Sequence, residues 1–245
     1  MAHIGVIKEL AKHNIPIDCI AGTSAGAIIG GLYAAWKDIE RIENLASKLN
    51  YQNFLDVFSD PLSKSGLFKG EKAERFLSSH LVDTQFEDLL LPFTAVTTDV
   101  VTGQRVLLSN GSLTKAMRAS SSIPFLFQPV EIEGKYLVDG AIACPVPVDV
   151  VRNMGADIVI SVNLYSPTPN QSIAKEKPPS TFSVVKSSIL LLLYHLAVSN
   201  EEKADFAVNP EIPNISLTEF VGGQKYIKKG EECIRKIIPD IKQAL

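Results

Sequence analysis

The stretch around Ser24 constrains the fold most strongly, because two glycines flank this serine between two apolar segments. An apolar run over residues 17–21 predicts a short buried strand, and Gly22-Thr23-Ser24-Ala25-Gly26 follows it directly. Small and apolar residues over 27–35 then favour a tightly packed helix. A strand, a G-x-S-x-G turn and a helix in this order are typical of a nucleophile elbow, which presents a serine hydroxyl at the end of a strand.

The same pattern has a purely structural interpretation, in which the small residues only permit a tight strand-to-helix turn. In the functional interpretation, Gly22 and Gly26 make room for the turn and Ser24 is the nucleophile. The first N–H groups of the helix would then favour the negative charge of a tetrahedral oxyanion. Ala25 is the candidate for one such oxyanion donor. A partner that can accept the serine proton would decide between the two interpretations.

Composition limits the class of protein. The chain has 245 residues, of which 46% are hydrophobic, and this suits one domain spanning residues 1–245 with a sizeable core. Because the formal net charge is −3, we do not expect a nucleic-acid partner. Three cysteines lie far apart without metal-ligand spacing, and the first residues do not resemble a signal peptide. We therefore expect reduced thiols, no metal, no cofactor and a cytoplasmic location.

Hydrophobic periodicity and turn residues predict alternating strands and helices, which is typical of a layered α/β fold. Strands are expected at residues 92–99, 105–108, 130–140 (a hairpin), 156–164 and 204–209, and helices at 2–13, 37–49, 71–81, 112–118, 148–154, 182–200 and 224–244. Residues 53–70 are expected to form a loop and short turns, and the proline-containing segment 166–181 a flap or surface loop.

The most apolar stretch, residues 189–198, is too short to span a bilayer by itself. We expect it to lie in a buried helix or in a helix at an interface. It could line an acyl channel or make peripheral contact with a membrane surface, and core packing is the alternative.

Histidine is the usual base for a serine nucleophile. None of the four histidines of the chain sits in a glycine-rich turn or at the end of a predicted strand: His3, His13, His80 and His195. His3 is closest in sequence to the predicted elbow, but nothing in the pattern supports a Ser–His–Asp triad.

A carboxylate is the better candidate for the base. Asp139 ends an apolar strand and is followed by Gly140 in a tight turn, away from other charges. Burial could raise its pKa toward neutrality, which would allow it to take the proton of Ser24 directly. The alternatives are that Asp139 is only a turn residue, or that Asp99, which also ends a strand, has this role.

These residues and several others resemble the bacterial type of the patatin-like phospholipase family. The matching segments agree in order and spacing over essentially the whole chain: Ala2-His3-Ile4-Gly5-Val6, Gly22-x-Ser24-x-Gly26, Ser65-Gly66-Leu67-Phe68, Thr98-Asp99 with Thr102-Gly103, Arg118-Ala119-Ser120-Ser121-Ser122-Ile123-Pro124, Phe127-Gln128-Pro129-Val130, Asp139-Gly140-Ala141 and Pro145-Val146-Pro147.

The resemblance implies a three-layer α/β/α fold with a mainly parallel central sheet. It also implies a Ser–Asp dyad, here Ser24 and Asp139, and hydrolysis of fatty-acyl esters through an acyl-serine intermediate. The expected activity is that of a phospholipase A or lysophospholipase, without a metal or cofactor. The implied substrate is a phospholipid or another fatty-acyl ester, so the protein is expected in the cytoplasm with peripheral contact to a membrane.

The sequence departs from the family pattern in two places. Family members normally start with a strand and a glycine-rich loop that supplies oxyanion donors, and Met1 stands where that loop has already ended. We expect either that the chain is part of a longer protein or that it is a short form with little or no hydrolase activity. Residues 141–144 also differ from the usual Gly and Asn, which affects the shape of the pocket.

Two other functions therefore stay open. One is a catalytically impaired family member that binds a lipid or a protein as a regulator. The other is a general carboxylesterase or thioesterase without preference for phospholipids.

Overall fold

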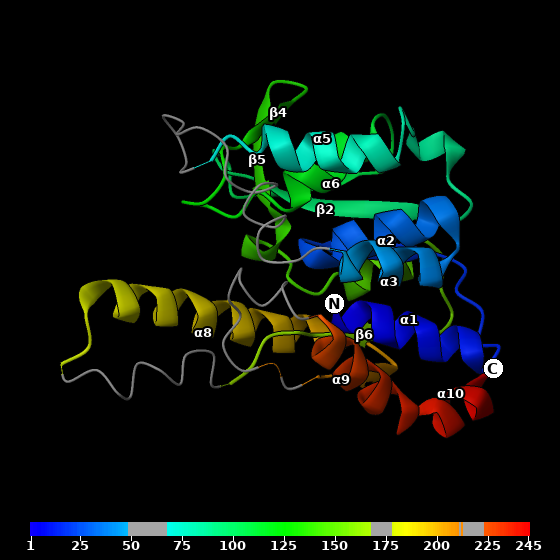
Figure 1. The fold of residues 1–245 in the computed structure, drawn as a ribbon. Coiled ribbons are helices and arrows are strands. Elements are labelled where there is room, and N and C mark those ends of the chain that lie inside the picture. The colour runs from blue at the N-terminus through cyan, green and yellow to red at the C-terminus, as the bar shows by residue number, and fades with distance from the viewer. Residues whose placement is uncertain (49–67, 168–177, 211, 213–222) are drawn as a thin grey trace.

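The computed structural model describes residues 1–48, 68–167, 178–210, 212 and 223–245. Most of the expected loop at 53–70 and of the expected flap at 166–181 lies outside these residues. Within them, strands and helices alternate as expected for an α/β protein (Figure 1).

The central sheet is built around strand β2 (Phe93–Asp99), which is buried along its whole length. The other strands of this sheet are β1 (Ile20–Thr23), β3 (Arg105–Leu108), β4 (Val130–Ile132) and β5 (Lys135–Asp139). The strand order is β1-β2-β5-β4, and β3 also pairs with β2. β1 runs parallel to β2, whereas the β2–β3, β2–β5 and β4–β5 pairs are antiparallel. A second sheet pairs β6 (Ile160–Val162) with β7 (Phe206–Val208) in parallel.

Helices cover both faces of the central sheet. Their bounds are α1 (Ala2–Lys12), α2 (Ala25–Trp36), α3 (Ile39–Ser47), α5 (Glu71–His80), α6 (Leu113–Ser120), α7 (Val148–Asn153), α8 (Thr181–Glu201), α9 (Gln224–Arg235) and α10 (Ile238–Ala244), with short 3-10 turns η1 (Phe86–Asp88) and η2 (Gly140–Ile142). Ser112 starts α6 as the sequence predicts, because its hydroxyl accepts a hydrogen bond from the N–H of Lys115.

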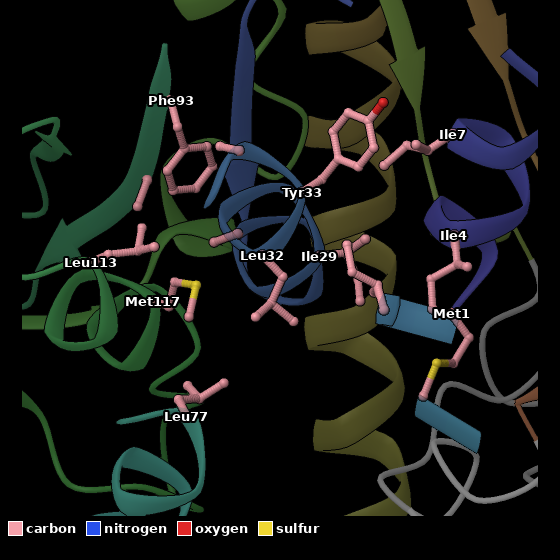
Figure 2. Close-up of a cluster of buried hydrophobic side chains, with 14 of the residues drawn as sticks. Met1, Ile4, Ile7, Ile29, Leu32, Tyr33, Leu77, Phe93, Leu113 and Met117 are labelled. Carbon is pink, nitrogen blue, oxygen red and sulfur yellow. The ribbon is translucent and has the colours of Figure 1, made fainter. Parts of the chain in front are cut away.

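The side chains of β2 alternate between two cores, and this alternation produces three layers. Phe93 and Ala95 belong to the largest cluster, which also holds Leu32 of α2 and Met117 of α6 (Figure 2). Val96 belongs to a cluster on the α7 side, with Cys144 and Val150. The α/β architecture with helices on both sides of a central sheet therefore agrees with the expectation.

Three of the differences from the predicted bounds have a clear physical cause. The first strand begins only at Ile20, whose N–H donates to the carbonyl of Pro92, so strand pairing starts three residues later than the apolar run. The strand predicted at 156–164 shrinks to Ile160–Val162, because the N–H of Val159 is taken by the carboxylate of Asp205. The last predicted helix is two helices, since Pro239 has no N–H to continue the ladder.

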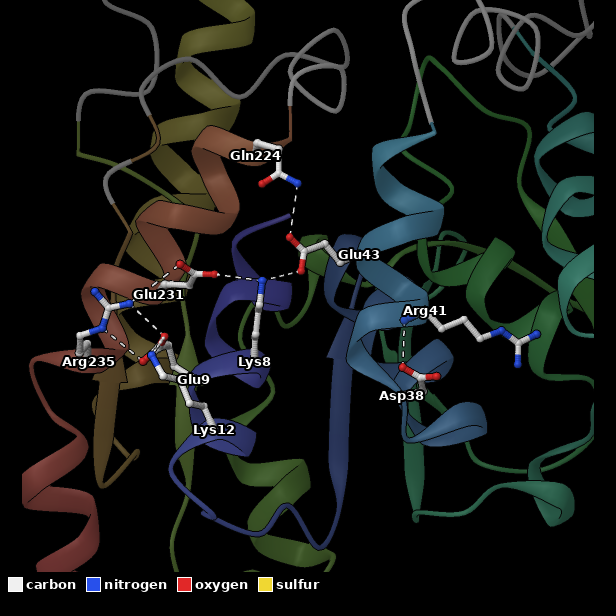
Figure 3. A network of polar contacts seen from close by, with 9 residues as sticks. All are labelled: Lys8, Glu9, Lys12, Asp38, Arg41, Glu43, Gln224, Glu231 and Arg235. Atoms are coloured by element: carbon white, nitrogen blue, oxygen red, sulfur yellow. Dashed lines mark hydrogen bonds and ion pairs between the residues drawn. The ribbon is translucent and has the colours of Figure 1, made fainter.

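Helix α1 packs closely against α9, and small residues make the contact possible. A Cβ atom at Gly5 would collide with the backbone carbonyl of Ile227, and one at Gly230 would collide with the carbonyl of Ala2. Around this contact lies a network of charged side chains (Figure 3). The buried carboxylate of Glu9 accepts hydrogen bonds from Arg235 at 2.9 and 3.2 Å.

Replacing Gly5 by alanine is expected to destabilise the protein by about 1–3 kcal/mol, because the added methyl group meets backbone and the two helices must separate. The sign is diagnostic, since alanine in place of glycine normally stabilises a helix by about 0.5–1 kcal/mol. Urea denaturation of Gly5→Ala and of the parent measures the difference. Equal or higher stability of the variant would contradict this packing.

Candidate functional site

Ser24 occupies a strained turn between β1 and α2. Its φ of 55° and ψ of −121° lie in a region that side chains rarely adopt, and it directly precedes the first residue of α2. Gly22 makes the turn possible, because a Cβ atom there would collide with the carbonyl of Gly26. The predicted strand–turn–helix context of Ser24 is therefore present in the structure.

The hydroxyl of Ser120, at the end of α6, fixes the backbone of this turn. Its Oγ accepts a hydrogen bond from the N–H of Ser24 at 3.1 Å and donates one to the carbonyl of Val96 at 2.6 Å. Ser120 is fully buried, so these two bonds satisfy polar groups that water cannot reach. The sequence indicated residues 120–124 as the end of a helix and as a segment shared with the family, but it assigned Ser120 no role in the site.

Asp139 is held at the end of β5 by its backbone and by its carboxylate. Its N–H donates to the carbonyl of Ser122 at 2.9 Å, and its own carbonyl accepts from the hydroxyl of Thr98 at 3.1 Å. One carboxylate oxygen, Oδ1, accepts the N–H of Ala141 at 2.9 Å. Gly140 permits this turn, because a Cβ atom at that position would collide with the carbonyl of Val96.

The structure brings Asp139 and Ser24 together. The Asp139 side chain is only 4% exposed, and this burial raises its pKa from 3.8 to about 6. A hydrogen bond from the Ser24 hydroxyl, and then the one from the N–H of Ala141, act in the opposite direction on the same pKa. The Ser24 hydroxyl therefore lies near enough to this carboxyl group to lower its pKa, against the larger effect of burial.

Asp99, the competing carboxylate, forms hydrogen bonds within the turn that follows it. It accepts hydrogen bonds from the N–H of Val101 at 3.0 Å and from the hydroxyl of Thr102 at 2.8 Å. Both bonds hold the pKa of Asp99 below its usual value, and the bond from Val101 has the larger effect. An acid of lowered pKa is a poor base, so the geometry favours Asp139.

The histidines occupy other environments. His3 lies over Gly26, near the turn, but burial lowers its pKa to about 3, and its Nδ1 makes no hydrogen bond within the described residues. His13 pairs with Glu9 on α1, and His80 hydrogen-bonds to the carbonyl of Phe76 on α5. His195 is exposed on α8 and contacts the ring of Tyr194.

Tyr165 is a neighbour of the site that the sequence did not reveal. It lies three residues after β6, where the Oδ1 atom of Asn163 accepts its N–H at 2.9 Å. Burial raises the pKa of its phenol, and the charge of Asp139 raises it further. The only signal in the sequence is the position of Tyr165 at the end of an apolar strand, where side chains of parallel sheets often reach a site.

Ala25 is the first residue of α2, so its N–H has no carbonyl partner one turn earlier in the helix. It therefore stays the candidate oxyanion donor. In the described part of the chain, no three His, Cys, Asp or Glu side chains lie close enough together to hold a metal ion. Two surface hollows, of about 400 and 580 Å³, are lined by neither Ser24 nor Asp139.

Known proteins similar to this chain place it in a family. The sequence model of the patatin-like phospholipases matches residues 1–152. An uncharacterized NTE family protein of Mycobacterium tuberculosis is 35% identical over 163 residues, which cover 66% of this chain and 45% of that protein. Patatin-like phospholipase domain-containing protein 7 of Rattus norvegicus is 33% identical over 175 residues, which cover 67% of this chain and 13% of that protein.

The neuropathy target esterase sws of Drosophila melanogaster is 29% identical over 170 residues, which cover 67% of this chain and 12% of that protein. The chain therefore spans less than half the length of these curated relatives. In fold it is similar to the crystal structure of VipD from Legionella pneumophila, with a TM-score of 0.56 and 15% identity over 98% of this chain and 64% of that one. With a family match over more than half of its length, the chain belongs to the patatin-like phospholipase family.

Proposed function

We propose that the protein is a serine-dependent hydrolase of lipid acyl esters, with Ser24 as nucleophile and Asp139 as base. The observation that carries this proposal is the placing of Ser24, in its strained turn, beside the buried carboxyl group of Asp139, whose pKa burial raises to about 6. Membership of the patatin-like phospholipase family and the esterase named among the relatives support a lipid ester as substrate.

In the first half of the reaction, Ser24 Oγ attacks the ester carbonyl carbon while Asp139 accepts the hydroxyl proton. The negative charge that develops on the carbonyl oxygen lies at the N-terminus of α2, where the N–H of Ala25 can donate to it. Collapse of the tetrahedral intermediate breaks the bond to the leaving alcohol, which takes the proton from Asp139. The acyl group is then bound to Ser24.

Water completes the reaction in the second half. It attacks the acyl-serine as Asp139 again accepts a proton. The bond between the acyl carbon and Ser24 Oγ then breaks, the serine recovers its proton from Asp139, and a fatty acid leaves. The serine and the carboxylate return to their starting states, so the cycle needs no metal or redox partner.

Replacing either member of the pair is expected to abolish hydrolysis. Ser24→Ala should lower kcat for a p-nitrophenyl acyl ester by about 10³-fold or more, and Asp139→Asn by about 10²–10⁴-fold, because the amide cannot accept a proton. Asp99→Asn is the matched control, since it changes a second buried carboxylate that ends a strand.

Labelling by a fluorophosphonate probe provides the second readout and distinguishes the enzyme from a regulator that only binds. Labelling should occur in the parent and in Asp99→Asn and be lost in Ser24→Ala. Hydrolysis that is unchanged in Ser24→Ala or in Asp139→Asn, with both proteins folded, would disprove the dyad.

The pH dependence of the reaction follows from the pKa of Asp139. Because Asp139 acts as a base, only its ionised form is active, so kcat/KM should rise tenfold per pH unit below about 6 and level off above it. Initial rates measured between about pH 4.5 and about pH 8 give the midpoint. A midpoint near 4, the ordinary value for aspartate, would contradict the burial-shifted base.

Ser120 is expected to act as a positioning residue. Ser120→Ala removes the acceptor for the N–H of Ser24 and the donor to Val96, so the turn loses its anchor. We expect kcat to fall at least about tenfold with little change in KM, and stability to fall by about 1–3 kcal/mol. The pH midpoint should stay near 6, because Asp139 is untouched.

Ser121→Ala is the control for this variant, because among the described residues the hydroxyl of Ser121 bonds only to the carbonyls of Met117 and Arg118 in α6. Equal turnover by Ser120→Ala and Ser121→Ala would show that the bond from Ser24 to Ser120 does not position the nucleophile.

A further inference from the structure

Helix α8 exposes an unusual amount of apolar side chain for a helix of this length. Phe182 is 77% exposed and Leu192 is 69% exposed, and four further large apolar side chains between them are also exposed: Val184, Val185, Ile189 and Leu191. Figure 1 shows the first turns of α8 extending away from α9 and β6. The expectation that this segment lies in a buried core helix is therefore wrong. The alternative expectation, a helix at an interface, remains.

The apolar composition of α8 suits contact with a membrane. It has 21 residues and, by length and composition, could cross a membrane, yet only 6% of its most apolar 18-residue window is buried in the protein. Lys186 is the only charged residue from Thr181 to Asn200. A core helix of a soluble domain passes the same test of composition, but it is mostly buried, and α8 is not.

The arrangement of the apolar side chains favours lipid over a protein groove. Phe182, Val185, Ile189 and Leu192 recur at helical spacing and form one stripe. Val184 and Leu191 lie about a third of a turn from this stripe and are also exposed, so the exposed apolar side chains cover about half of the helix circumference. A single partner helix would cover only part of so broad a face and leave the rest in water, whereas lipid chains can cover all of it.

The polar, proline-containing segment before α8 excludes a helix that crosses the bilayer. Both ends of the helix connect to β6 and β7 of the same small sheet. If the start of α8 lay beyond the membrane, residues 166–180 would have to cross it as well, and they contain four prolines together with Lys175, Glu176 and Lys177. Such a segment cannot satisfy its backbone and charges in hydrocarbon.

The C-terminal end of α8 is fixed to the domain beside the candidate site. Ala197 packs in a cluster with Val146 and Val148, which follow the Asp139 turn, and Tyr165 packs against the same cluster. The carboxylate of Glu201 accepts hydrogen bonds from Ser161, Asn163 and Asn209, each at 3.2 Å. The apolar start of the helix therefore extends from a rigid attachment.

We propose that residues 182–192 of α8 insert into one leaflet of a phospholipid bilayer and hold the protein at the membrane surface without crossing it. Lys186 suits a leaflet that contains anionic headgroups, because its long side chain can reach the phosphates while its stem stays among the acyl chains. This interaction does not depend on the proposed hydrolase activity.

Flotation with vesicles tests the proposal. The parent protein should float with vesicles of phosphatidylcholine and phosphatidylglycerol, and the variant I189E/L192E should bind them at least about tenfold more weakly. The control V82E/V101E adds the same charge at two other exposed apolar positions, which are 77% and 75% exposed, and should float like the parent. Circular dichroism and thermal melting establish that both variants are folded.

Two results would overturn the proposal: a parent protein that stays with the soluble fraction, or I189E/L192E floating as well as the parent. Light scattering after size exclusion detects the main competing occupant, a second copy of the chain. A parent that dimerises through α8 and does not float would assign the surface to self-association instead.

Quenching of tryptophan fluorescence by brominated lipids tests how deeply α8 inserts into the leaflet. Tryptophans introduced as Phe182→Trp and Leu192→Trp should both be quenched, to a similar degree, by bromine placed within one leaflet. Trp36, the single tryptophan of the parent, lies at the end of α2 and serves as the unquenched reference. Quenching of only Leu192→Trp, or of neither, would contradict insertion of the whole stretch.

Discussion

The position of β2 between β1 and β5 is the constraint on which the candidate site depends. Thr23, just before the serine, pairs with Val96, and Asp139 pairs with the next residue, Thr97. The carbonyl of Val96 also accepts the hydroxyl of Ser120, which in turn holds the N–H of Ser24. One strand thus sets the register of both candidate catalytic residues, although they lie 115 positions apart in the sequence.

Placing a carboxyl group in this position has an energetic cost. The pKa of Asp139 rises from 3.8 to about 6, which corresponds to about 3 kcal/mol in favour of the protonated form. Because the folded pKa lies above the unfolded one, ionisation of Asp139 removes stability as the pH rises from about 4 to about 6, and the loss is complete above the folded pKa. The Ser24 hydroxyl and the N–H of Ala141 offset part of this cost, and the same environment gives the carboxylate the basicity that the proposed proton transfer requires.

The sequence was informative where a local pattern determines the structure. Ser24 and Asp139 could be found because each ends an apolar strand beside a glycine that the turn requires. Ser120 and Tyr165 could not, because their roles come from contacts with residues far away in the chain, such as the bond between Ser120 and Ser24. The start of the strand after Gly155 depends on Asp205, which is distant in the sequence. An apolar helix such as α8 looks the same in sequence whether it is buried or exposed.

The contact between Ser24 and the buried carboxyl group of Asp139 is the central claim, and it can be measured without substrate. A titration of the Asp139 carboxyl carbon by ¹³C NMR, assigned with Asp139→Asn, gives its pKa directly. We predict a value of about 6 in the parent and a higher value in Ser24→Ala, because loss of the serine hydrogen bond removes an interaction that lowers it. A parent value near 4, or one that is the same in Ser24→Ala, would contradict the account.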